Sequence, residues 1–173
     1  MEVFQAIKER RSIRSFKNKD VSQDKIKKLV EAAIWAPSGS NIHAWRLYAV
    51  KCEKKKKIEK FSPGLLSDPP VLLIFCTDKE KSLEKGGKQA RDKLSTMDVA
   101  IAAQNICLQA ESMDLGTCYI GSFDETALNE ILDLEEKMEP ELMLAVGHPK
   151  EIPEAPSRRE VEEAVEWMGW NDE

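Results

Sequence analysis

The chain has 173 residues, 42% of them hydrophobic and 33% charged, with a formal net charge of −5 and a pI near 5.3. These values fit one soluble globular domain with a sizeable core, and the acidic balance argues against a general nucleic-acid binder. No apolar run is long enough to cross a membrane, and residues 1–8 do not resemble a signal peptide, so we expect a cytoplasmic protein.

Cysteine and histidine usage limits the chemistry that the chain can support. Cys52, Cys76, Cys107 and Cys118 show no CxxC spacing and lie in apolar neighbourhoods, so we expect buried free thiols and no metal site. With only two histidines, a hydrolytic triad has little support.

Hydrophobic spacing predicts two helices at the start of the chain. Apolar residues three and four apart fall on one face of residues 2–9. A longer apolar stripe begins after Ser22, a good N-cap, and Pro37 ends that helix. The elements expected next are a polar loop at 37–41, a strand at 45–50 and a short basic helix at 54–60.

The middle of the chain predicts the core of the fold. Residues 71–76 are continuously apolar, which is typical of a central strand covered on both faces. Residues 78–93 are charged and contain two adjacent glycines, so we expect a mobile or partly helical excursion. Residues 96–114 favour a helix whose uncharged part, 99–110, is buried nearly all round and which Gly116 closes.

The last part of the chain adds two strands and a helix. A strand at 117–120, a helix capped by Asp124 and a strand at 142–146 complete the order helix, helix, strand, helix, strand, helix, strand, helix, strand. The sequence has no internal repeat and no linker. We therefore expect a single domain over residues 1–173, with an α+β or α/β sandwich architecture.

The C-terminal tail, residues 160–173, predicts an acidic amphipathic helix. Its Trp167 and Trp170 need an apolar surface against which to bury their rings. We therefore expect this tail to pack on a partner subunit.

Three arginines, Arg10, Arg11 and Arg14, form the most informative cluster in the sequence. Guanidinium groups this close repel one another unless an anion lies between them, and arginines with nearby serine hydroxyls suit a phosphate. The plain alternative is a solvated basic patch, which charge runs often are. If the first helix continued this far, Arg10 and Arg14 would share a face and Arg11 would point elsewhere.

A second pair of arginines, Arg158 and Arg159, stands near the other end of the chain, and a small polar loop, residues 38–41, lies between the two clusters. No GxGxxG follows a strand and no GxxxxGK[ST] is present, so a Rossmann site or a P-loop is unsupported. The arginines and the loop together could hold a mononucleotide-like ligand, with the arginines on its phosphate.

Four stretches of the chain resemble signatures of the nitroreductase family of FMN-dependent oxidoreductases. They are, in order, Arg10–Phe16, Ala36–Asn41 with Trp45, Asp98–Asn105 with Leu115-Gly116, and Gly147-His148-Pro149 with Arg158-Arg159. The four stretches stand in the family's order and cover essentially the whole chain.

The resemblance implies a three-layer α+β sandwich with a mostly antiparallel sheet flanked by helices, built as an intertwined homodimer around the helix at 99–110. It implies hydride transfer from NADH or NADPH through FMN to an electron-poor acceptor, such as a nitroaromatic or a quinone, by a ping-pong mechanism. The flavin supplies the chemistry in such enzymes, so no catalytic side chain is expected.

The resemblance also assigns contacts with FMN to individual residues. Those expected on the phosphate, the ribityl chain and the pyrimidine edge are Arg10, Arg11, Ser12 and Arg14, with Arg158 or Arg159 completing the phosphate site. Ile120 and Gly121 are expected near flavin N5. The contacts expected from the other subunit come from Pro37, Ser38, Gly39, Ser40 and Asn41.

The chain departs from the family pattern at three places. His43 and Ala44 stand where Gln-Pro often precedes the tryptophan, and His43 either contacts the flavin or is a plain loop histidine. Ile120 stands where some members have Glu, and the insertion after the second strand is reduced to residues 78–93. The alternatives are therefore a specialised branch (a dehalogenase, an ene-reductase-like or a flavin-consuming enzyme), a non-catalytic FMN carrier or sensor, and an anion-binding module without flavin.

Overall fold

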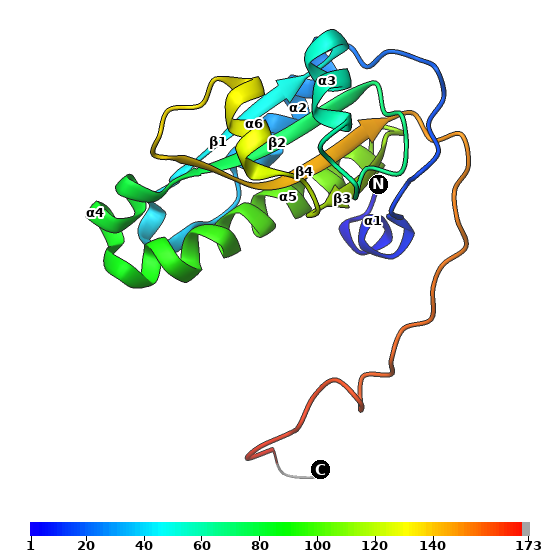
Figure 1. The fold of residues 1–173 in the computed structure, drawn as a ribbon. Helices are drawn as coiled ribbons and strands as arrows, with labels where there is room; N and C mark the ends of the chain where they lie inside the picture. The colour runs from blue at the N-terminus through cyan, green and yellow to red at the C-terminus, as the bar shows by residue number, and fades with distance from the viewer. Residues whose placement is uncertain (171–173) are drawn as a thin grey trace.

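The structure, a computed structural model, describes residues 1–170 and has a four-stranded antiparallel sheet at its centre (Figure 1). The strands are β1 (Trp45–Val50), β2 (Val71–Asp78), β3 (Gly116–Ile120) and β4 (Met138–Gly147). Their order across the sheet is β1-β2-β4-β3, and every neighbouring pair is antiparallel. Helices cover both faces, so the predicted α+β sandwich is confirmed.

The described helices include the five that the sequence predicts before the tail, in the predicted order, and one more, α4. They are α1 (Val3–Glu9), α2 (Gln23–Ile34), α3 (Cys52–Glu59), α4 (Lys79–Gln89), α5 (Ser95–Glu111) and α6 (Glu125–Leu132). A 3-10 turn at Gly39–Asn41 precedes β1, and a π-helical turn at Ala90–Leu94 joins α4 to α5. The predicted caps are present, since the side chains of Ser22 and Asp124 accept backbone N–H bonds at the starts of α2 and α6.

Strand β2 lies at the centre of the core, as its continuous apolar run predicts. Successive side chains of a strand point to opposite faces of the sheet, and both faces of β2 are covered. Val71, Leu73 and Phe75 pack with residues of α2 and α5, whereas Leu72 and Ile74 pack with residues of α3 and α6. The sheet is therefore the middle of three layers.

The charged segment 78–93 is more ordered than the sequence predicts. Its first part forms α4, because the side chain of Asp78 accepts the Lys81 N–H at 2.8 Å and caps the helix. Gly87, with φ of +70°, interrupts the helix. The segment is therefore a kinked helix that continues into α5, and not the mobile or partly helical excursion that we expected.

Gly116 does not close α5, contrary to our expectation. The helix ends at Glu111, and the left-handed residue that follows it is Asp114, with φ of 55°. Gly116 is instead the first residue of β3, where a Cβ atom would lie 2.4 Å from Cγ1 of Ile13. The glycine is needed there because another segment of the chain passes very close to the strand.

Helix α5 is buried on one side only. Val99, Ala102 and Ala103 lie in the core, whereas Met97 and Ile101 are 48% and 39% exposed. The prediction of a helix buried nearly all round is therefore wrong for one chain by itself. An uncharged helix with apolar residues on its outer side is typical of a surface that another subunit covers.

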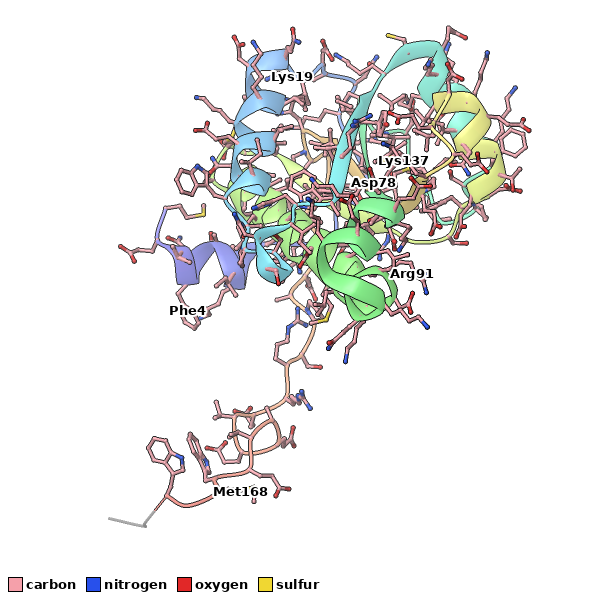
Figure 2. All side chains as sticks on the ribbon, turned by 90° about the vertical axis from the view of Figure 1, so that its left-hand side faces the viewer. Phe4, Lys19, Asp78, Arg91, Lys137 and Met168 are labelled. Carbon is pink, nitrogen blue, oxygen red and sulfur yellow. The ribbon has the colours of Figure 1, made fainter. Side chains whose placement is uncertain are left out.

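The tail differs from the predicted amphipathic helix. Residues 151–170 are extended, apart from a turn at 162–164, and run away from the sandwich (Figure 1). Figure 2 shows Met168 far from the body of the protein. Trp167 and Trp170 contact each other edge to face, with 5.3 Å between ring centroids. Residues 171–173, the end of the predicted helix, lie outside the described residues. That the tail packs on a partner subunit stays a prediction.

Three of the four cysteines are buried as predicted, but Cys52, at the start of α3, is exposed. Among residues 1–170, no helix is both long and apolar enough to span a bilayer, and no group of His, Cys, Asp and Glu side chains is arranged to hold a metal ion.

The close approach at Gly116 generates a prediction about stability. Gly116→Ala should lower the free energy of unfolding by about 1–3 kcal/mol, because the added methyl group overlaps Ile13. The measurement is urea denaturation followed by circular dichroism. Gly121→Ala is the matched control, since nothing lies within 4 Å of its added carbon. An equal loss of stability in both variants would contradict the packing argument.

Candidate functional site

The segment that follows α1 lies along the outer edge of β3. Ser12 forms a parallel bridge with Thr117, and the Ile13 N–H donates to the Thr117 carbonyl at 2.8 Å. Ile13 is buried, whereas Arg10, Ser12 and Arg14 are at least partly exposed.

The same segment also contacts the chain after β4. Phe16 pairs with Pro149, and the Lys17 N–H donates to the His148 carbonyl at 2.8 Å. A Cβ atom on Gly147 would lie 2.7 Å from the Phe16 ring, so glycine is required at this crossing. The first and last of the four sequence signatures are thus brought together by backbone contacts.

Arg11 is separated from the other two arginines. Because α1 ends at Glu9, the helical face that Arg10 and Arg14 would have shared does not form. Nη1 of Arg11 donates to the carbonyls of Lys8, Glu9 and Arg10 at 2.7, 2.9 and 3.0 Å. A cation at a helix C-terminus is favourable. The predicted FMN contact of Arg11 stays a prediction, and its side chain already has partners at the end of α1.

Arg10 and Arg14 make no side-chain hydrogen bond or ion pair with the described part of the chain. Burial raises the pKa of the Cys118 thiol in β3, and the positive charges of Arg14 and Arg10 oppose that rise. Both guanidinium groups therefore lie near the same strand. They provide free donors for an anion.

The end of the same strand, β3, offers open backbone. Gly121 is exposed, and the space where its side chain would point is empty. Ile120 is 3% exposed and packs in the core on the α3 and α6 side, so a ligand can reach only its backbone. This end of β3 suits the flat edge of a polar ring.

The loop at residues 38–43 adopts strained backbone. Ser40, Asn41 and His43 have φ values of 52°, 56° and 46°, a region that costs non-glycine residues about 1 kcal/mol or more each. His43 Nε2 lies 2.7 Å from Asn41 Oδ1. This local contact favours the alternative in which His43 is a plain loop histidine. A contact between His43 and the flavin stays a prediction.

Two residues that the sequence analysis did not assign to the site hold this loop. The Gly39 N–H donates to Oδ1 of Asp98 at 2.9 Å, and Lys81 Nζ donates to the His43 carbonyl at 2.9 Å. Asp98 is 7% exposed, so its carboxylate acts in a shielded environment. The signal that would have identified it is a single acidic residue at the start of an otherwise uncharged helical run.

The loop and the arginine segment lie at opposite edges of the sheet. The loop leads into β1, whereas residues 12–13 pair outside β3, so four inter-strand spacings, about 19 Å, separate them. They also lie toward opposite ends of α5, because the loop is anchored at Asp98 and Arg10 approaches Glu111. One chain therefore does not bring the two predicted halves of the site together.

Arg158 and Arg159 do not join Arg10 and Arg14 within the chain. Both lie in the extended tail (Figure 1). Nη1 of Arg158 donates only to nearby carbonyls, those of Pro156 at 3.3 Å and Ser157 at 3.1 Å. Completion of the phosphate site by either arginine stays a prediction.

Comparison with known proteins gives the family. The sequence model of the nitroreductase family matches residues 7–70 and 60–148. The chain belongs to the nitroreductase family. It is therefore an oxidoreductase, and the arginine segment, the 38–43 loop and the end of β3 all lie in the matched part of this nitroreductase-family sequence.

Two curated relatives of this nitroreductase-family chain have similar sequences. A Methanothermobacter thermautotrophicus protein named as an NADH dehydrogenase/NAD(P)H nitroreductase is 32% identical over 160 residues, which are 88% of this chain and 80% of the relative. An NADPH-dependent oxidoreductase of Staphylococcus aureus is 32% identical over 162 residues, 85% of this chain. The matched part is 64% of the length of the S. aureus protein.

Solved structures share the fold of the nitroreductase-family chain. A nitroreductase family protein from Streptococcus pneumoniae aligns with a TM-score of 0.89 and 22% identity, over 96% of this chain and all of that one. The NADPH:FMN oxidoreductase of Vibrio harveyi, solved with NAD+, aligns with a TM-score of 0.85 and 24% identity, over 98% of this chain and 78% of that one.

The role of Asp98 can be tested directly. Asp98→Ala should lower the free energy of unfolding by about 1–3 kcal/mol and speed hydrogen exchange of the Gly39 amide, because it removes a charged acceptor. Asp98→Asn is the matched control, since its side-chain oxygen still accepts. Unaltered exchange at Gly39 in the alanine variant would show that the loop is held by other contacts.

Proposed function

We propose that this chain is an FMN-dependent oxidoreductase that takes hydride from NADH or NADPH and passes it to an electron-poor acceptor, such as a nitroaromatic or a quinone, by a ping-pong mechanism. The observation behind this proposal is the pair of guanidinium groups of Arg10 and Arg14, which have no side-chain partner within residues 1–170 and lie near β3, the strand that ends in open backbone at Gly121. The names of the relatives, which include NAD(P)H nitroreductase, NADPH-dependent oxidoreductase and NADPH:FMN oxidoreductase, support it.

The residues of the chain fit the groups of FMN by their chemistry. Arg10 would supply a charge-assisted donor for the phosphate, with Ser12 close in the same segment, and Arg14 would supply a second such donor. The Gly121 amide has room for a flat ring at short distance. FMN, when bound, would supply the hydride-accepting and hydride-donating chemistry. The protein's part is to bind, orient and exclude water, and no side chain acts as an acid or base.

We propose further that two copies of the chain complete each site. The Arg10–Arg14 segment of one copy would face the 38–43 loop of the other, which resolves their separation at opposite edges of the sheet. The anchoring of the loop by Asp98 and Lys81 supports this arrangement, because it fixes a strained loop away from the arginine segment of its own chain.

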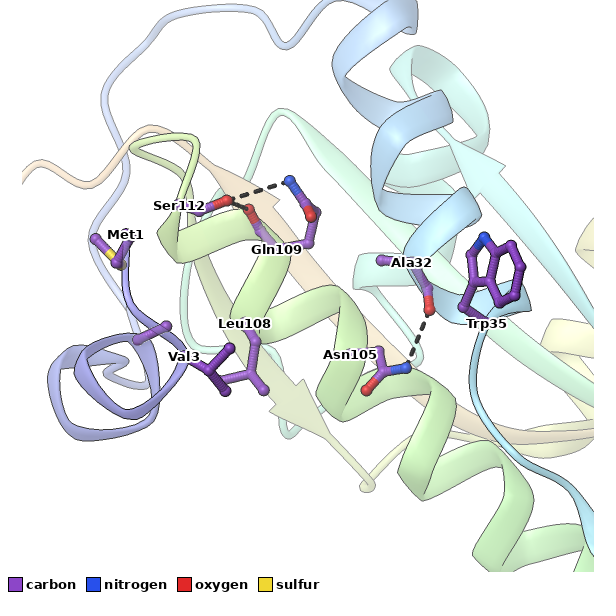
Figure 3. Close-up of a pocket in the computed structure, with 9 residues that line it drawn as sticks. Met1, Val3, Ala32, Trp35, Asn105, Leu108, Gln109 and Ser112 are labelled. Atoms are coloured by element: carbon purple, nitrogen blue, oxygen red, sulfur yellow. Dashed lines mark hydrogen bonds between the residues drawn. The ribbon is translucent and has the colours of Figure 1, made fainter.

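The exposed apolar surface around α1 and α5 supports a homodimer. Phe4 in α1 is 70% exposed and points away from the body of the protein (Figure 2). A groove of about 360 Å³ runs between α1, α2 and α5, and Trp35 at its edge is 81% exposed (Figure 3). Within the groove, Nδ2 of Asn105 in α5 donates to the Ala32 carbonyl in α2 at 3.1 Å. Apolar area of this kind is typical of a subunit interface.

Flavin binding and reduction test the proposed activity. The protein should bind FMN, and its visible absorption should bleach when NADPH or NADH is added without oxygen. Arg10→Ala should weaken FMN binding about ten-fold or more, since a hydrogen bond to a charged group contributes about 1.5–3 kcal/mol. The control is Arg91→Ala, whose guanidinium pairs with Asp92 on the surface. Failure to load FMN would contradict the proposal, and bound flavin that never bleaches would favour a carrier.

A mixing experiment tests the composite site. One variant carries Arg10→Ala and the other carries Ser40→Ala with Asn41→Ala, and each alone should bind FMN poorly. After dissociation and reassembly, mixed dimers have one intact site and one doubly altered site, so about a quarter of all sites should regain FMN affinity. Titration with FMN measures this fraction. No recovery on mixing would indicate that both sets of residues act from the same chain.

A further inference from the structure

A second concave surface begins at Arg14, and its other residues have no part in the function proposed so far. This basic cleft has a volume of about 670 Å³ and is lined by residues 14–20, the start of α3, the loop at 68–70 and Lys150. Figure 2 labels Lys19 on this segment, at the end of the molecule opposite the tail. The cleft draws on four parts of the sequence that are far apart.

Backbone contacts fix the positions of the cationic residues in the basic cleft. The Lys17 N–H donates to the His148 carbonyl at 2.8 Å, and the Lys150 N–H donates to the Ser15 carbonyl at 2.9 Å. Lys17 and Lys150 are therefore held on adjacent strands of chain, at positions that the fold imposes. Lysines that are merely solvated on the surface would not need to be brought together from distant parts of the sequence.

The charge of the basic cleft is opposite to that of the chain. The chain has a net charge of −5, yet Arg14, Lys17, Lys19 and Lys150 have no side-chain hydrogen bond or ion pair within residues 1–170. A concave surface with cations of one sign focuses the electrostatic field and attracts anions. These side chains are free to bind an anionic ligand.

The two carboxylates of the basic cleft do not neutralise it. Asp20 forms an ion pair with Lys51, and Asp68 forms one with Lys55. Lys55 also pairs with Glu59 at 2.6 Å. Burial acts to lower the pKa of Lys55, but the hydrogen bonds to Asp68 and Glu59 outweigh it and raise that pKa, so the lysine stays charged. Both carboxylates are therefore paired with lysines that line the cleft. Lys17, Lys19 and Lys150 remain without an ion pair within residues 1–170.

Arg14 joins the basic cleft to the proposed flavin site, because it lines the cleft and also lies near Cys118 in β3. We propose that the cleft binds the phosphates of the adenosine half of the nicotinamide donor, and that Lys17, Lys19 and Lys150 favour the donor with the additional 2′-phosphate, NADPH, over NADH. This inference rests on the proposed function. A phosphate monoester gains more from clustered ammonium groups than a hydroxyl group does.

The test compares two triple variants of the full chain. In the cleft variant Lys17, Lys19 and Lys150 are each changed to Gln. In the control variant Lys28, Lys57 and Lys60 are each changed to Gln, since these exposed lysines lie outside the cleft and form no ion pair within residues 1–170. Both variants change the net charge equally, and neither removes a described side-chain contact.

Binding is measured by calorimetry with 2′,5′-ADP and with inorganic pyrophosphate as probes, and KM is measured with NADPH and with NADH. The cleft variant should bind 2′,5′-ADP about ten-fold or more weakly and should show a similar rise in KM for NADPH, with a smaller rise for NADH. The control variant should retain both values. Equal effects in the two variants, or no effect in either, would overturn the proposal.

The two probes and the two donors separate the failure of this inference from the failure of the proposed function. If neither donor reduces the protein but 2′,5′-ADP binding is lost only in the cleft variant, the proposed reaction is wrong and the phosphate site stands. If flavin is reduced but pyrophosphate binds as tightly as 2′,5′-ADP and NADPH has no advantage, the assignment of the 2′-phosphate is wrong.

Discussion

The pairing of residues 12–13 with β3 is the contact on which the proposed site depends. It holds the chain after α1 at the outer edge of β3, and so places Arg10 and Arg14 at that edge of the sheet. Two glycines make it possible, because Gly116 lets Ile13 approach β3 and Gly147 lets Phe16 cross the end of β4. The functional segment is thus positioned by backbone contacts and the absence of two Cβ atoms.

The rest of the architecture separates the arginine segment from the 38–43 loop within one chain. The antiparallel order β1-β2-β4-β3 sends the strained loop to one edge and the arginines to the other. Helix α5 covers one face of the sheet with Val99, Ala102 and Ile106 but leaves Ile101 on its outer side. Geometry and exposed apolar surface therefore both support the proposal that two copies assemble.

The sequence predicts the core well because periodicity and burial are local properties. The run at 71–76 indicates a strand covered on both faces, and Ser22 and Asp124 mark helix starts by a mechanism that needs no tertiary contact. The family and its motifs were also recognisable. The predicted helix in the tail is wrong for a different reason, since a short amphipathic helix is marginal without a surface to cover its apolar face.

Other features depend on contacts between distant segments, and no local pattern shows them. The role of Gly116 follows from Ile13, which lies more than a hundred residues away in the sequence. The partners of Arg11 follow from the point at which α1 ends. The basic cleft follows from the meeting of residues 14–20 with Lys150, and its lysines are unremarkable when they are read one at a time.

The separation of the arginines and the loop has a consequence for how the protein would behave at different concentrations. A cofactor that contacts two chains binds only their assembled form, so cofactor binding and subunit association are linked by mass action. Dilution would release both together, and an excess of free cofactor would hold the subunits together. The amount of active protein would then rise more steeply than the amount of chain, and a cell that makes little of it would have almost none that is active.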